Sequence, residues 1–267
     1  MSVNKCLELP DLTFETKAEM FRAIKDNYAL IVDAKKASIK TSDRLNFAPA
    51  TGNVLKGLTL DSGYIYPVIN TTKYMDSHND VHLDGIWDRS LKHVQGTIYY
   101  LANHELKVGQ VVAYPKDVKV MVQLVKWKDL GFDFEGETQA LMFKISKDKV
   151  RMQEARTIIE EKIDIEHSVR MQYVKFTLAI DSLEPDFKAE KENYDKIISK
   201  IVNRKRAEEA GYFFAIEEAK IIKEGSMVLN GSNDTTPLIL PKSDSPEGTP
   251  PPDSPDGTRT RKRRMLF

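Results

Sequence analysis

The chain has 267 residues, of which 41% are hydrophobic and 30% charged, as is typical of a globular protein with one sizeable core. Its 40 basic and 40 acidic side chains cancel, so the whole molecule offers no field that attracts nucleic acid or an anionic membrane. The single cysteine, Cys6, excludes an intrachain disulfide and a thiolate metal cluster. No export-signal pattern or membrane-spanning apolar run is found, so we expect a protein of a reducing compartment that does not span a membrane.

The first half of the chain predicts a helix followed by strands. Thr16 and Glu19 form a capping-box pattern at the start of a helix over 17–27. The apolar residues of 29–39 are typical of a short strand, and 46–63, with three glycines and a proline, of a loop. The remaining predictions are a short helix over 87–93 and strands over 64–70, 97–101, 108–114, 118–125 and 139–145.

The second half predicts two helices and further strands. Helices are expected over 152–163 and 190–210, with Gly211 as the C-terminal cap of the second. Strands are expected over 169–180, 213–222 and 226–229, the last two as a pair.

These elements do not alternate regularly, which predicts an α+β fold with a mostly antiparallel, barrel-like sheet flanked by helices. One folded domain is expected over 1–240. From 241 to 267 Ser, Pro, Asp, Gly and Thr dominate, which predicts a disordered tail. The tail ends in a basic cluster, Arg259 to Arg264.

Three of the five histidines suggest no catalysis. His93 ends a short helix among charged residues and is interpreted as a surface side chain. His78 and His82 lie in an alternating polar segment that could hold a metal or form a solvated turn; the spacing matches no known ligand template and favours the turn. The segment comprises Asp76, His78, Asp80, His82 and Asp84.

The other two histidines concern the choice of a general base. His104 lies at the end of an apolar strand, where polar groups often serve chemistry, although the pattern taken alone favours a structural core or surface histidine. His167 directly precedes Ser168; on a strand their side chains point to opposite faces, so His167 cannot be the base for Ser168. His104 is then the best placed partner.

Ser168 opens a strand on which Ser168, Arg170 and Gln172 share one face, so this face lines a cleft or emerges into water. The chain has no Gly-x-Ser-x-Gly elbow, which disfavours an α/β-hydrolase, and no phosphate-binding loop.

Four segments in this order resemble the prohead (capsid-maturation) serine proteases of tailed phages, whose fold is shared with the herpesvirus protease assemblin. They are Asp76 to Leu91, Tyr100 to His104 with Val108-Gly109, Glu166 to Tyr173, and Ile221 to Val228 with Asn233. The resemblance spans about residues 60 to 240; residues 1–60 match only loosely. Arg170 stands where the family often has glycine, and 190–210 lengthens the gap to the closing segment.

The resemblance implies a serine endopeptidase with His104 as base and Ser168 as nucleophile. Glu224 is expected to orient His104, with a surface glutamate as the alternative interpretation and Glu217 and Glu218 as fallback candidates. Backbone N–H groups would form the oxyanion hole, and no metal or organic cofactor is needed.

The implied substrates are the scaffolding protein and the major capsid protein, cut inside the assembling prohead in the host cytoplasm. We also expect self-cleavage of the 241–267 tail, and a homodimer is an open possibility. Two rivals are a catalytically inactive capsid-assembly scaffold on the same fold and a nucleic-acid-binding module that acts through Arg259 to Arg264. The intact His104 and Ser168 argue against the first, and the zero net charge argues against the second.

Overall fold

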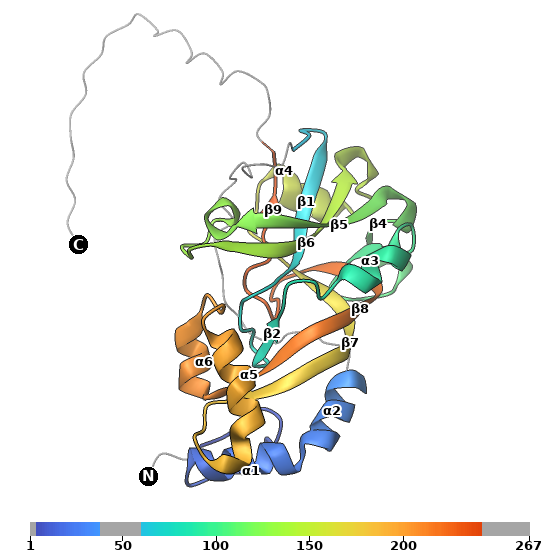
Figure 1. The fold of residues 1–267 in the computed structure, drawn as a ribbon. Coiled ribbons are helices and arrows are strands. Elements are labelled where there is room, and N and C mark those ends of the chain that lie inside the picture. Colours follow the sequence, from blue (N-terminus) through green and yellow to red (C-terminus); the bar gives the residue numbers. More distant parts are fainter. Residues whose placement is uncertain (1–3, 38–59, 242–267) are drawn as a thin grey trace, which may run out of the picture.

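The computed structural model describes residues 4–37 and 60–241, which form an α+β fold (Figure 1). The described strands make two sheets, one antiparallel and one mixed, with the main hydrophobic core between them. Neither sheet closes into a barrel in this part of the chain, so the α+β class predicted from sequence is confirmed while the barrel-like closure is not found. No described helix is both long and apolar enough to cross a lipid bilayer.

The antiparallel sheet has the strand order β5-β6-β1-β9. These strands are β5 (Val118–Lys126), β6 (Glu137–Ser146), β1 (Tyr64–Thr71) and β9 (Leu238–Ile239). Seven of the eight residues of β1 and six of the ten of β6 are buried, because one face meets the second sheet and the other meets a smaller aromatic cluster around Trp127.

The mixed sheet is built around β8 (Tyr212–Val228). One edge of β8 pairs antiparallel with β7 (Glu166–Ile180). The other edge pairs in parallel with β2 (Asp80–His82) and then with β3 (Tyr99–Ala102), which in turn pairs with β4 (Val111–Ala113). Helix α3 fills the gap between β2 and β3, where the Ser90 hydroxyl accepts a hydrogen bond from the Ile221 N–H.

Helices α1, α2, α5 and α6 gather beside β7 and β8 at one end of the molecule (Figure 1). Thr16 and Glu19 form the predicted capping box at the start of α1. The α-helices are α1 (Lys17–Asp26), α2 (Tyr28–Ala37), α3 (Asp88–Val94), α4 (Gln153–Glu160), α5 (Lys188–Ile198) and α6 (Arg204–Ala210). Short 3₁₀ turns are η1 (Val108–Gln110), η2 (Pro115–Asp117), η3 (Trp127–Leu130), η4 (Lys147–Lys149) and η5 (Pro185–Phe187).

Three element predictions are wrong. The strand predicted over 29–39 is helix α2, which buries Ile31 and Lys35 one turn apart. The helix predicted over 190–210 is divided into α5 and α6. Asn203, just before α6, has a non-helical backbone, and its side chain makes two hydrogen bonds with the Met75 backbone. Gly211 does cap α6 in the left-handed region. The strand pair predicted over 213–229 is the single strand β8.

Two other predictions fall largely outside the described residues. The tail over 241–267 is described only at Pro241, and the loop over 46–63 only from residue 60 onward. The expected domain over 1–240 is likewise described without 1–3 and 38–59.

A bulge in β8 sets the direction of the residues around Glu224. The register between β7 and β8 jumps from Val169↔Gly225 to Met171↔Ile221, and Lys223 adopts a left-handed φ of 63°. Bulges of this kind bend a strand and redirect its side chains, and they are frequent beside active sites. Beyond the bulge Gly225 faces the core, where an added Cβ would lie 2.8 Å from Phe143 Cζ and 2.9 Å from Ile69 Cγ2.

Gly225→Ala should therefore lower the free energy of unfolding by about 1–3 kcal/mol, because overpacking a rigid core forces backbone or ring shifts. Urea unfolding followed by circular dichroism measures the change. Gly109→Ala is the matched control, since its Cβ would meet no atom within 4 Å. Equal stability of the two variants would contradict the packing described for Gly225.

Candidate active site

His104 lies in a tight turn just beyond the end of β3. Asn103 and His104 both have positive φ values, of 54° and 58°, which non-glycine residues adopt at a cost. Two hydrogen bonds to β8 hold this turn: Asn103 N donates to Met227 O at 2.9 Å, and His104 N donates to Ser226 Oγ at 3.1 Å. The imidazole is thereby directed back across β8.

The side chain that receives this imidazole is the fully buried Glu224. Its Oε1 accepts hydrogen bonds from His104 Nδ1 at 2.7 Å and from Arg170 Nε at 2.9 Å. Its Oε2 accepts one from Ser226 Oγ at 2.6 Å. A carboxylate is expensive to bury unless donors surround it, and here three donors from three segments of the chain do so.

This contact defines which ring nitrogen of His104 is available for chemistry. When Nδ1 donates to a carboxylate, the neutral ring carries its proton there and presents a lone pair at Nε2. His104 Nε2 is buried and has no hydrogen-bond partner among the described residues, and the whole side chain is 8% exposed. A buried polar atom without a partner calls for an explanation, and a proton acceptor that serves a nucleophilic hydroxyl is one.

Ser168 lies on the same sheet face as this cluster. It pairs in register with Ser226 across β7 and β8, and Ser226 pairs with Leu101 on β3. Paired residues point to the same face, so Ser168 and Glu224, two positions from Ser226 on β8, share that face. Ser168 is 6% exposed, and no hydrogen bond joins its Oγ to His104 Nε2 in the structure. Catalytic hydrogen bonds without bound substrate are often long or absent.

Arg170 holds the histidine and the glutamate together. Besides the bond from Nε to Glu224, its Nη2 donates to the His104 carbonyl oxygen at 2.9 Å. From the sequence, Arg170 was placed on the face of Ser168 and in the position of the family's glycine, with no role predicted. Its position two residues after Ser168, on the same face as Glu224, is the signal that could have suggested this contact. Ser226, two residues after Glu224, carries the same signal.

His167 lies on the opposite face of the sheet from Ser168, as strand alternation predicted. Its Nε2 lies 2.9 Å from Tyr100 Oη, and its Nδ1 lies 2.9 Å from Thr236 O. Burial lowers the pKa of His167 to about 4, so the ring is neutral at physiological pH. These contacts give His167 a structural role that joins β7 to the segment before β9.

The remaining candidates do not contact His104. Glu217 pairs with Lys175, and Glu218 lies 3.1 Å from Arg89 on the outer surface. Gln172 is exposed and donates to the Lys36 carbonyl oxygen at 3.2 Å. His93 is exposed, as predicted.

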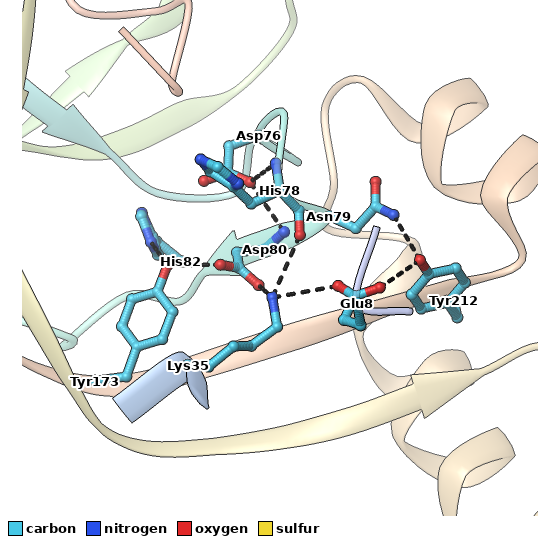
Figure 2. A network of polar contacts seen from close by, with 9 residues as sticks. All are labelled: Glu8, Lys35, Asp76, His78, Asn79, Asp80, His82, Tyr173 and Tyr212. Carbon is cyan, nitrogen blue, oxygen red and sulfur yellow. Dashed lines mark hydrogen bonds and ion pairs between the residues drawn. The ribbon is translucent and has the colours of Figure 1, made fainter. Parts of the chain in front are cut away.

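The polar segment over 76–84 is not the solvated turn that was predicted. Asp76, Asp80 and His82 are each no more than 1% exposed. Figure 2 shows the reason: Lys35 reaches in from α2, with its Nζ 2.6 Å from Asp80 Oδ1 and 3.4 Å from Glu8 Oε1. Buried ion pairing between distant parts of the chain leaves no pattern in the local sequence. No described group of three or more His, Cys, Asp or Glu residues is arranged to hold a metal ion.

Burial in the network of Figure 2 also shifts the pKa values of two of its side chains, Asp76 and His82. Burial, reinforced by the neighbouring charge of Asp80, raises the pKa of Asp76 to about 8. Burial lowers the pKa of His82 to about 4, and its ring contacts Asn70 and Tyr173. Asp76 Oδ1 accepts hydrogen bonds from the backbone of His78 and Asp80, which an asparagine could also accept.

Asp76→Asn should change how stability depends on pH. The folded chain keeps the Asp76 proton up to about pH 8, whereas an unfolded chain releases it near pH 4. The stability contribution of Asp76 is therefore complete below about pH 4 and is lost as the pH rises through about 8. Urea unfolding of both proteins should show the wild type losing stability relative to the variant over this range.

Asp11→Asn, which replaces an exposed carboxyl, is the matched control for the substitution itself. A difference between wild type and Asp76→Asn that stays constant from pH 4 to 8 would contradict the protonation assigned to Asp76.

Comparison with protein-family models, with curated proteins and with solved structures finds no match for the chain. The assignment of a function therefore depends on the geometry described above and on the sequence motifs.

Proposed function

We propose that the chain is a serine endopeptidase in which Ser168 is the nucleophile, His104 the general base, and Glu224 the residue that orients His104. The observation that carries the proposal is the buried Glu224 carboxylate 2.7 Å from His104 Nδ1, with His104 Nε2 left without a described partner on the face that bears Ser168. A base held by a third group, beside a hydroxyl, is the arrangement that nucleophilic catalysis requires.

The reaction follows from these roles. Ser168 Oγ attacks the scissile carbonyl carbon while His104 Nε2 takes the hydroxyl proton, and Glu224 stabilises the resulting imidazolium. His104 then donates the proton to the leaving amine as the C–N bond breaks. Water, deprotonated by the same nitrogen, hydrolyses the acyl-enzyme. Arg170, bound to both Glu224 and the His104 carbonyl oxygen, keeps the ring in place throughout. None of these steps needs a metal or an organic cofactor.

The sequence resemblance supports a narrower assignment within this activity. We assign the chain to the prohead-protease type, with an assemblin-like arrangement of its residues 1–240, because the four resembling segments contain His104, Ser168 and Glu224. The substrates are then the scaffolding protein and the major capsid protein, cut within the assembling prohead in the host cytoplasm. A homodimer belongs to the same proposal.

One observation favours a second candidate, a capsid-assembly scaffold without catalytic activity. Ser168 and His104 are both nearly buried, and no hydrogen bond joins them in the structure. A scaffold would need the Glu224 cluster only for stability. Chemical reactivity of Ser168 separates the two functions.

A fluorophosphonate probe should label the wild-type chain at Ser168, because His104 raises the nucleophilicity of this hydroxyl. Labelling, read by mass spectrometry of peptides, should fall at least 100-fold in His104→Gln and vanish in Ser168→Ala. Ser199→Ala, at an exposed serine after α5, is the control and should label like the wild type.

Labelling that survives in Ser168→Ala, or that is absent from a folded wild type, would contradict the peptidase proposal and favour the inactive scaffold. Circular dichroism on each variant shows that loss of labelling is not loss of folding.

Self-cleavage of the 241–267 tail gives a second test. The composition of this segment predicts disorder and disordered chain is easily cut, so the intact mass of the wild type should fall during incubation while that of Ser168→Ala stays constant. Mixing the two proteins should shorten the variant if cleavage occurs between molecules. A wild-type mass that never changes would contradict autoprocessing.

A further inference from the structure

Two hollows meet on the surface of the mixed sheet. The larger, of about 990 Å³, lies between α3 and the β8 segment 218–223. The smaller, of about 370 Å³, lies over β3 and β4 and is bordered by 106–108. Tyr99 and Lys223 line both hollows, which therefore adjoin and make one groove, called here the β3–β8 groove.

The groove borders the candidate active site on the same face of the sheet. Tyr99 pairs in register with Glu224, and Leu101 pairs with Ser226. Because paired residues share a face, the floor of the smaller hollow continues the face that bears Glu224 and Ser168. Leu106, on the rim, comes two residues after His104, and Lys223 directly precedes Glu224.

Apolar side chains line both hollows, and Lys107 and Lys223 stand among them in the smaller one. Leu106 is 51% exposed and Val108 is 89% exposed. Tyr99 and Tyr114 stand edge to face with ring centroids 6.3 Å apart. Exposed apolar side chains gathered in a concave site are typical of a surface that binds a ligand.

The rim of the larger hollow is basic. Lys36, Lys220 and Lys223 line it, and none forms an ion pair with a described acidic side chain. The acidic side chain among the lining residues, Glu218, is paired with Arg89. In a molecule of zero net charge this local excess of lysine is a specific feature, and like charges held together favour an acidic ligand.

We propose that the β3–β8 groove binds an extended peptide that carries apolar side chains for the smaller hollow and Asp or Glu side chains for the lysines. The inference rests on the proposed function, under which this peptide is the substrate segment that flanks the scissile bond. Its apolar residues fill the hollow beside His104, and its acidic residues lie toward α3. The groove thus selects acidic segments of the partner protein for cleavage.

The test is direct binding, measured with the full chain carrying Ser168→Ala so that no probe is cut. A fluorescein-labelled ten-residue peptide that alternates Leu or Tyr with Glu is titrated, and fluorescence polarisation gives its Kd. Its counterpart with Lys in place of Glu is the ligand control. The Glu peptide should bind at least tenfold more tightly than the Lys peptide. Its affinity should fall as salt rises from about 0.05 to 0.5 M, because screening weakens exposed charge attraction.

Adding Lys220→Glu and Lys223→Glu should weaken binding of the Glu peptide at least tenfold and remove the preference over the Lys peptide. The matched control replaces Lys119 and Lys188, two exposed lysines outside the groove lining, with Glu and should leave the Kd within twofold of the parent. Equal weakening by both pairs, or equal binding of the two peptides, would overturn the groove. Fluorophosphonate labelling of Ser168 reports separately on the peptidase, so either proposal can fail without the other.

Discussion

A buried carboxylate holds the candidate site together. Glu224 satisfies its oxygens with donors from the turn after β3, from β7 and from its own strand, so three segments distant in sequence converge on one side chain. The left-handed backbone conformations of Lys223, at the bulge, and of His104 are unfavourable in conformational free energy, and the surrounding contacts offset them. Removing the carboxylate would leave Arg170 and the His104 ring without their shared acceptor, so the geometry of the base depends on this one group.

The same physical solution occurs a second time, at the other end of the mixed sheet. There the ammonium group of Lys35 is buried between Asp80 and Glu8, and it attaches α2 to β2 (Figure 2). Burial alone would lower the pKa of Lys35, but the charges of Asp80 and Glu8 raise it above its ordinary value. One buried charge cluster therefore leaves the Nε2 atom of His104 without a described partner, whereas the other attaches a helix to the sheet. Burial of titratable groups is not by itself a sign of catalysis.

The sequence predicted the elements whose signals are local. Strong alternation marked β5, and the capping box at Thr16 and the glycine after α6 marked helix ends. The prediction was wrong where contacts between distant residues determine the secondary structure. Segment α2 is a helix whose buried lysine, Lys35, pairs with Asp80. Asn203 interrupts a predicted helix and binds the backbone of Met75. At the site, motif order suggested His104, Ser168 and Glu224. For Arg170, strand alternation indicated only the face that it shares with Ser168, because its two partners lie 54 and 66 residues away and meet it only through the fold.

In the proposed site, Glu224 fixes the His104 ring with its proton on Nδ1 and leaves Nε2 as the base. Proton-coupled ¹⁵N spectra of histidine-labelled protein, recorded near pH 9 where an ordinary histidine is neutral, report which nitrogen carries the proton. The signals that disappear in the His104→Gln variant are those of His104. We expect a protonated Nδ1, with a strongly downfield proton resonance that shifts upfield in Glu224→Gln. A proton found on Nε2 would contradict it, because that nitrogen could then accept nothing from Ser168.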